Sequence, residues 1–244
     1  MADRLSFSRF AILLAQAAHP AWQALLRVIY PSRCVGCGAR LPEDPTPLCH
    51  RCSSRLERVE AERLAALLAK LPEAETTLDG VFALWLFDDG GTVQRLQHLL
   101  KYGNRPAYGV ALGRLIGVAY RETAAPRPDL VLPVPLHRAR RYERGYNQSA
   151  ALAHGLGRYL GAPSSETTLT RPRATSSQTN LSRQRRWENV AGAFVVAQPE
   201  AVAGRTLLLV DDVLTTGATL AAAAQALKQA GAASVHAATL ALAR

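Results

Sequence analysis

The sequence from residue 206 to residue 219 reads Thr206-Leu-Leu-Leu-Val210 and then Asp211-Asp212-Val-Leu-Thr215-Thr216-Gly217-Ala218-Thr219. The apolar run 206–210 is typical of a buried strand, and the alanine-rich stretch that follows Thr219 is typical of a helix. Two carboxylates therefore come where a buried strand ends, and a turn of hydroxyls and glycine leads directly into a helix. Strands that alternate with helices in this way build parallel sheets.

The residue types in this unit suit a phosphorylated sugar. A helix N-terminus presents unpaired backbone N–H groups and the positive end of the helix dipole, which together favour a phosphate. Glycine lets the backbone approach a ligand closely, and ionised carboxylates accept hydrogen bonds from sugar hydroxyls. We therefore expect two acids to bind a diol and the turn to bind a 5′-phosphate; the residues are Asp211, Asp212, Thr215, Thr216, Gly217, Ala218 and Thr219.

Two other interpretations of this unit stay open. Asp, Thr and Gly between a strand and a helix are also ordinary capping residues. An Asp pair can also hold magnesium, as in receiver domains, although a receiver places its pair near the start of the domain and only 32 residues follow Asp212 here. A Walker A loop is excluded because no Gly-Lys-Ser/Thr follows the turn.

Strand-like and helical segments alternate from residue 78 onward. We expect strands over residues 81–87, 130–134, 206–210 and 235–240, helices over 92–102, 108–123, 149–160 and 218–230, and short strands at 167–169 and 194–196. This alternation predicts an α/β fold with a doubly wound parallel sheet. Ligands of such sheets bind at the carboxyl ends of strands, where both the Asp pair and residues 133–135 are expected.

Three blocks of the sequence resemble one family. Residues 208–219 resemble the phosphoribosyl-pyrophosphate (PRPP) motif of type I phosphoribosyltransferases. Residues 131–149, with Val-Leu-Pro-Val-Pro-Leu-His137 and Arg144-Gly-Tyr-Asn-Gln-Ser149, resemble the ComF competence family, also called the ComF/GntX group. A third block fits that family too, with Thr175-x-x-Gln178-x-x-Leu181 and then Arg186-x-x-Asn189-Val-x-Gly-Ala-Phe194.

The resemblance implies a domain that binds PRPP with Mg²⁺ and uses Asp211 and Asp212 as catalytic acids. It also implies that the loop after the first parallel strand binds pyrophosphate, through His137, Arg138 and Arg144. Residues 171–192 resemble the hood that covers PRPP in this fold, and they include Arg186. Arginine suits this task because its planar fork binds phosphate oxygens in pairs. Lys101, at the end of a helix, either reaches a phosphate or caps that helix.

All four cysteines lie in two Cys-x-x-Cys pairs. Two such turns can direct four thiolates at one ion, which is the closed tetrahedral arrangement of structural zinc. The alternatives are a disulfide framework, which belongs to oxidising compartments, and a thioredoxin-like redox motif, which accounts for one pair and not two. We expect a structural Zn site with His50 outside the ligand set; the ligands are Cys34, Cys37, Cys49 and Cys52.

Composition limits the classes of protein and partner. The chain has 244 residues, 48% of them hydrophobic and 20% charged, which is enough for one sizeable core and unlike a disordered chain. Its net charge is +10, and the placement is uneven: residues 133–186 carry ten arginines against two acids. A basic field of this kind attracts phosphate-bearing partners, either a pyrophosphate ligand or a nucleic acid.

The sequence predicts no membrane span, since no apolar run reaches the ~18–20 residues required. The N-terminus allows two interpretations. Residues 10–18, after Arg4 and Arg9, resemble a short secretory signal, but apolar residues from Phe7 onward also recur at helical spacing. We favour an amphipathic helix and a cytoplasmic protein because Asp3 intrudes and the apolar run is short.

We expect four parts along the chain: an N-terminal helix over residues 1–30, a zinc-knuckle module over 31–56, a helical connector over 57–77 and a phosphoribosyltransferase-like domain over 78–244. Three functions stay open. The resemblance implies a ComF-type protein of DNA uptake and natural transformation that transfers a phosphoribosyl group to a nitrogen nucleophile. The first alternative is a non-enzymatic module that binds nucleotides or single-stranded DNA beside a helicase-like competence partner. The second is a regulator that senses PRPP without consuming it.

Overall fold

The computed structural model describes residues 32–41, 46–68, 78–172 and 192–243. The helix expected over residues 1–30 lies outside the described residues. So does most of the expected hood, residues 173–191, including Arg186.

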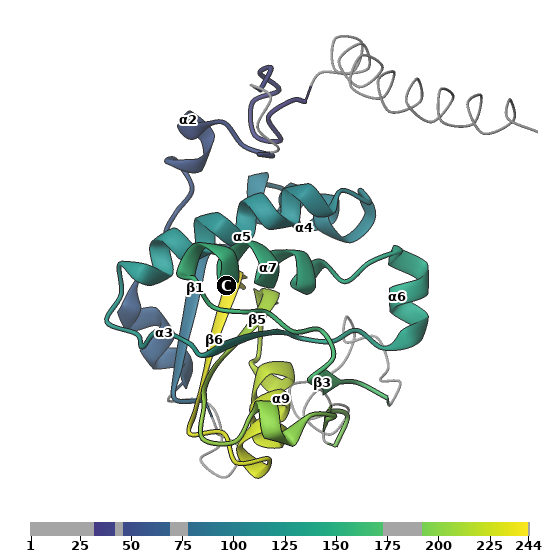
Figure 1. The fold of residues 1–244 in the computed structure, drawn as a ribbon. Helices are drawn as coiled ribbons and strands as arrows, with labels where there is room; N and C mark the ends of the chain where they lie inside the picture. The colour runs from purple at the N-terminus through teal and green to yellow at the C-terminus, as the bar shows by residue number, and fades with distance from the viewer. Residues whose placement is uncertain (1–31, 42–45, 69–77, 173–191, 244) are drawn as a thin grey trace, which may run out of the picture.

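A four-stranded parallel sheet forms the centre of the larger domain (Figure 1). Its strands are β1 (Gly80–Leu86), β2 (Leu130–Pro133), β5 (Thr206–Leu214) and β6 (Ser234–Leu242), in the spatial order β1-β6-β5-β2. Every neighbouring pair is parallel. Most residues of the two inner strands are buried, as expected for strands covered on both faces.

Helices cover both faces of this sheet, so the predicted doubly wound α/β fold is confirmed. On one face, Leu208 and Val210 share a hydrophobic cluster with residues of α4 (Thr92–Tyr102), α5 (Pro106–Arg121) and α7 (Gln148–Leu160). On the other face, Leu207 and Leu209 share a cluster with residues of α3 (Ala61–Leu68) and α9 (Ala218–Gln229). Successive residues of β5 thus face opposite helical layers, because side chains alternate along a strand.

Smaller elements complete the described chain. The segment that holds the cysteines contains α2 (His50–Ser53). The loops of the larger domain contain α6 (Arg138–Arg144) and the 3₁₀ turn η3 (Pro199–Ala201). The strands β3 (Leu169–Thr170) and β4 (Val195–Val196) pair antiparallel in a separate two-stranded sheet. Among the described residues, no helix has both the length and the hydropathy required to cross a membrane.

The structure differs from the sequence-based expectation at two places near the expected site. First, β5 does not end at Val210 but continues through the Asp pair to Leu214, because β6 runs beside it to Leu242 and supplies backbone partners for the extra residues. Second, residues 138–144, which we expected to be a loop, form α6. His137 accepts a hydrogen bond at the start of this helix, and Gly145 ends it in the left-handed conformation.

Candidate functional site

Two neighbouring carboxylates near the end of β5 are held by two different helices. Asp211 Oδ1 accepts a hydrogen bond from Ser149 Oγ at 2.8 Å, and Ser149 lies in the first turn of α7. Asp212 Oδ2 lies 3.1 Å from Lys101 Nζ, at the end of α4. Gln97 Nε2, one turn earlier on α4, donates to the same oxygen at 3.4 Å. The two acids are therefore oriented separately, Asp211 by α7 and Asp212 by α4.

The surroundings of the two acids push their pKa values in opposite directions. Burial and the neighbouring charge of Asp212 raise the pKa of Asp211 to about 7, despite the hydrogen bond from Ser149. Burial also raises the pKa of Asp212, but the charge and hydrogen bond of Lys101 outweigh it and hold that pKa below its usual range. Asp212 is thus an anion at neutral pH, whereas Asp211 titrates near neutrality. Carboxylates separated in this way take different chemical roles.

The turn after β5 leads into a helix whose N-cap residue is a glycine. Thr215 is exposed, Thr216 is half-buried, and Gly217 has φ of +77°, a left-handed conformation that strains any residue with a Cβ. Gly217 has no side chain that could cap α9, which begins at Ala218. The backbone N–H groups at the start of this helix and the helix dipole are suited to an anion. In the structure the two acids lie in the last half of β5, and the turn at 215–217 connects this strand to α9.

The residues expected to bind pyrophosphate lie along α6 and at its end. His137 Nδ1 accepts a hydrogen bond from Ala139 N at 3.3 Å, so this side chain caps α6. Arg138 is exposed in the first turn. Arg144, in the last turn, donates from Nη1 to Gln148 Oε1 at 3.0 Å, and its charge helps to lower the pKa of Asp212. Arg144 is therefore the member of this set that acts on the acid pair.

Sequence reasoning missed the partners of several residues that build this site. Lys101, which we expected to reach a phosphate or to cap its helix, pairs with Asp212 in the structure. Asn147 caps α7 through Ser149 N at 3.1 Å and donates from Nδ2 to Val134 O at 3.1 Å, so it joins the end of β2 to the helix that holds Asp211. Ser149 and Asn147 stand in a motif that we recognised, but their partners are distant in sequence and no local pattern indicates them.

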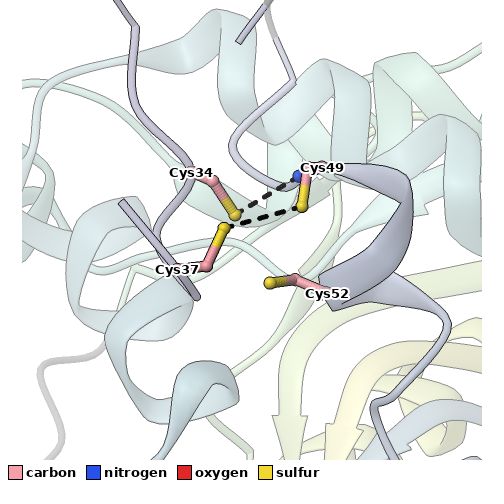
Figure 2. Close-up of side chains that lie close together, drawn as sticks. All are labelled: Cys34, Cys37, Cys49 and Cys52. Atoms are coloured by element: carbon pink, nitrogen blue, oxygen red, sulfur yellow. Dashed lines mark hydrogen bonds between the residues drawn. The ribbon is translucent and has the colours of Figure 1, made fainter. Parts of the chain in front are cut away.

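The four cysteines come together in one cluster, as predicted. Figure 2 shows the four side chains pointing toward one another, two from the loop before residue 41 and two from the start of α2. The four sulfur atoms all lie within 4.8 Å of one another, and none of the cysteines is in a disulfide. The Sγ atoms of Cys37 and Cys49 are 3.8 Å apart. Tetrahedral zinc with Zn–S bonds of about 2.3 Å separates its sulfurs by roughly the same distance.

The surroundings of the cluster shift the pKa values of two of its thiols in opposite directions. Burial raises the pKa of the Cys34 thiol, but backbone N–H groups, chiefly that of Cys49, outweigh it and lower the pKa to about 6. Cys49 N donates to Cys34 Sγ at 3.3 Å. In contrast, burial and the neighbouring sulfurs raise the pKa of Cys52 to about 12. Four thiolates in such close proximity repel one another without a metal, so the geometry and the ligand type both fit structural zinc.

Two family models match the chain and agree with these two sites. Residues 149–244 match the phosphoribosyl transferase domain, and residues 25–70 match the double zinc ribbon domain. The first match covers α7 through β6, and therefore the Asp pair and the turn into α9. The second covers the four cysteines.

Curated relatives are similar to a large part of the chain. The DNA utilization protein YhgH of Salmonella typhi is 42% identical over 145 residues, which is 58% of this chain and 63% of that protein. Competence protein F of Haemophilus influenzae is 29% identical over 203 residues, 81% of this chain and 85% of that protein. Competence protein ComFC of Bacillus subtilis is 34% identical over 113 residues, 46% of this chain and 43% of that protein.

The chain therefore spans less than two thirds of the length of the YhgH relative, and the similarity to competence protein F extends over most of both chains. These relatives, the phosphoribosyl transferase domain, the parallel sheet and the four-cysteine cluster agree with one another. The chain is thus similar to competence and DNA utilization proteins, and its C-terminal part matches the phosphoribosyl transferase domain.

Proposed function

We propose that this chain binds PRPP with Mg²⁺ at the end of β5 and transfers the phosphoribosyl group to a nitrogen nucleophile, as a cytoplasmic protein of DNA uptake. The observation that carries this proposal is the left-handed turn at Gly217 into the start of α9, a short distance after two acids whose pKa values are shifted in opposite directions. A phosphate suits the first feature and a ribose diol suits the second.

In this proposal the turn binds the 5′-phosphate. The hydroxyls of Thr215, Thr216 and Thr219 donate to the phosphate oxygens, and the N–H groups of Gly217 and Ala218 complete the cradle. Asp212, held ionised by Lys101, accepts hydrogen bonds from the ribose hydroxyls. Asp211 accepts a further hydroxyl through the oxygen that Ser149 does not use.

The diphosphate of PRPP lies toward α6 and α7. Arg144 is held by Gln148 and its charge acts on Asp212, which supports its proposed role in binding the diphosphate oxygens. His137, Arg138 and, from the hood, Arg186 complete the proposed set. Mg²⁺ would neutralise part of the diphosphate charge and strengthen pyrophosphate as a leaving group.

Departure of pyrophosphate leaves positive charge on the ribosyl ring. The ionised Asp212 stabilises this charge in a site where burial strengthens the interaction. Asp211, with its pKa near neutrality, is suited to take up or release a proton as the nucleophile adds. The same arrangement would also serve a regulator that binds PRPP without turnover. A measurement of pyrophosphate release distinguishes such a regulator from an enzyme.

Calorimetric titration of PRPP with Mg²⁺ tests the site. We expect Asp211→Asn with Asp212→Asn to abolish binding. The matched control is Asp129→Asn, because Asp129 accepts a hydrogen bond from Thr206 N at the opposite end of the same strand. Equal PRPP affinity in the wild type and the double variant would refute the site. Pyrophosphate release measured with a panel of nitrogen nucleophiles then separates turnover from binding alone.

A second candidate function has its own supporting observation. The side chain of Tyr142 is 92% exposed, and it lies on α6 among four arginines. An exposed aromatic ring within a basic helix suits single-stranded DNA, because bases stack on the ring while the cations contact phosphates. In this alternative the chain is a non-enzymatic binding module that works beside a helicase-like competence partner; its relatives include a DNA utilization protein and a competence protein.

Salt-dependent titration of single-stranded DNA tests this alternative. Replacing Arg138, Arg140 and Arg141 by alanine should weaken binding and reduce the slope of affinity against salt concentration. Tyr142→Ala should weaken binding with little change in that slope, since stacking does not release counterions. An affinity and a slope that both match the wild type in the arginine variant would remove this role from α6.

A further inference from the structure

A pocket of about 420 Å³ lies near the start of β2, at the other end of the strands from the Asp pair. It is formed by the last residues of α5 and α7 and by the segment that leads into the first residue of β2, Leu130. The Asp pair lies instead at the carboxyl ends of the parallel strands. The pocket is therefore separate from the proposed PRPP site, and its volume is in the range of small-molecule sites, roughly 300–1,000 Å³.

The lining of this pocket is strongly basic. Three arginines line it, Arg121, Arg127 and Arg158, and no acidic residue does. Within the part of the chain that the structure describes, none of the three forms an ion pair. The rest of the lining includes two tyrosines, Tyr120 and Tyr159, so an apolar wall lies beside the cations.

Two of the three guanidinium groups are held in place. Arg127 Nη2 donates to Gly161 O at 3.2 Å, and the guanidinium of Arg121 lies 5.7 Å from the centre of the Tyr159 ring. Gly161 has φ of +68°, and a Cβ at this position would lie 2.9 Å from Arg127 Nη2. The left-handed backbone favours glycine here, and the end of the Arg127 side chain lies against it. Both arginines are exposed, so these contacts orient their guanidinium groups toward the pocket without burying them.

Helix dipoles explain only part of this charge. Arg121 and Arg158 lie in the last turns of α5 and α7, where a cation offsets a helix end equivalent to about −0.5 of a unit charge. Arg127 belongs to neither helix. Three positive charges against two such ends leave a balance of about +2 in the pocket. A phosphate monoester carries about −1.5 to −2 at neutral pH, which matches this balance better than a carboxylate does.

We propose that this pocket is a second ligand site, which binds the phosphate group of a nucleotide with the arginines and its apolar body against the tyrosine wall. The guanidinium forks bind phosphate oxygens in pairs. The Tyr120 hydroxyl donates a hydrogen bond to Pro126 O at 3.2 Å, so it keeps its proton. Tyr120 therefore adds an uncharged ring to the pocket wall and no negative charge that would repel a phosphate. Burial raises the pKa of Tyr120 to about 12, in keeping with a neutral phenol. The nucleotide is either free or part of a strand.

Calorimetric titration of AMP into the full chain tests this site. The variant carries Arg121→Gln, Arg127→Gln and Arg158→Gln together, and its fold is checked by circular dichroism. We expect its affinity for AMP to fall roughly tenfold or more, because a single charge-assisted hydrogen bond contributes about 1.5–3 kcal/mol. The matched control is Arg114→Gln, since Arg114 is exposed on the same helix α5 and lies outside the pocket. The control should bind AMP as the wild type does.

The Asp211→Asn and Asp212→Asn double variant separates this proposal from the proposed function. It should lose PRPP while it keeps the arginine-dependent AMP site. A parallel titration with a twelve-residue oligothymidylate distinguishes the two sources of the nucleotide. If the triple arginine variant loses affinity for AMP alone, the ligand is a free nucleotide. If it loses affinity for the oligonucleotide, the ligand is a nucleic-acid strand. Either loss supports the phosphate site.

Photo-crosslinking with 8-azido-AMP places the ligand. Modified residues should fall in segments 120–128 and 158–161, which line the pocket. Three results would overturn the proposal: neither probe bound by the wild type at millimolar concentration, equal affinities in the wild type and the triple arginine variant, or modification confined to other segments such as 211–219.

Discussion

Lys101 Nζ lies 3.1 Å from Asp212 Oδ2 and joins the end of α4 to the strand that carries the acid pair. The two side chains are 22% and 10% exposed, so water screens this pair only in part. The same helix α4 shares a hydrophobic cluster with Cys34, Leu41 and Leu48 of the cysteine module. One helix therefore packs against the proposed zinc site and also supplies the counter-ion of the proposed ribose site.

Removing Lys101 should destabilise the fold. Lys101→Met leaves Asp212 buried without its counter-ion, and we expect a loss of about 2 kcal/mol in the free energy of unfolding, less than the roughly 3–5 kcal/mol of a fully buried pair. Urea denaturation measures this loss. The matched control is Lys228→Met, because Lys228 pairs with Asp79 at 2.8 Å where both are more exposed. The control should cost less than about 1 kcal/mol, and equal costs would contradict the buried role of Lys101.

The stability of Asp211→Asn relative to the wild type should depend on pH. The pKa of Asp211 is raised from 3.8 to about 7, so the folded state binds its proton more tightly than the unfolded state does. In the wild type this group therefore destabilises the fold increasingly as pH rises from 3.8 to about 7, and by a constant amount above that. The Asn variant lacks this penalty, so its advantage should grow over the same window in urea denaturation.

Asp79→Asn is the control for that pH series. Burial raises the pKa of Asp79, but Lys228 outweighs burial and lowers it. The stability that Asp79 contributes is therefore fully present above 3.8 and lost only as pH falls through its lowered pKa. From about pH 5 to 8 the difference between this variant and the wild type should therefore change only through His236, whose pKa burial lowers and the charge of Asp79 raises in part. A constant difference for Asp211→Asn would show that its proton is not held as we infer.

Gly217→Ala should remove ligand binding beyond its effect on stability. Alanine at φ of +77° costs about 1–2 kcal/mol, and its methyl group would stand beside the proposed phosphate cradle. Gly204→Ala matches the strain, since Gly204 has φ of +69° and a Cβ there would meet nothing within 4 Å. We expect similar losses of stability in both variants and a loss of ribose 5-phosphate binding, measured by calorimetry, in the first alone. Binding retained by Gly217→Ala would argue against the cradle.

Purified protein should contain about one zinc per chain by mass spectrometry. Cys52→Ser should lower this content, whereas His50→Ala should not, because four thiolates complete the site. Chelation should lower the melting temperature and increase hydrogen exchange in residues 92–102, since α4 packs in the same cluster as the cysteine module. Unchanged exchange in α4 after the metal is removed would show that the module is not coupled to the sheet domain.

The sequence by itself determined the main features of the fold and of both sites. The spacing of apolar residues indicated the strands of the sheet and the helices that cover it. Buried parallel strands are continuous apolar runs, and the covering helices repeat apolar residues on one face. The two Cys-x-x-Cys pairs indicated one cluster, and the run from Asp211 to Thr219 indicated a site at the start of a helix. These signals are local: each depends on residues close together in the chain, where spacing limits geometry.

Tertiary structure alone decided which residues support those sites. Lys101 and Ser149 meet the acid pair only because α4 and α7 pack on the same face of the sheet, and no spacing in the sequence records that contact. The extension of β5 to Leu214 depends on β6 running beside it. The basic pocket likewise exists only where the ends of α5 and α7 lie together. Contacts between distant segments are set by the packing of whole layers, because the energy that fixes them is shared by the entire core.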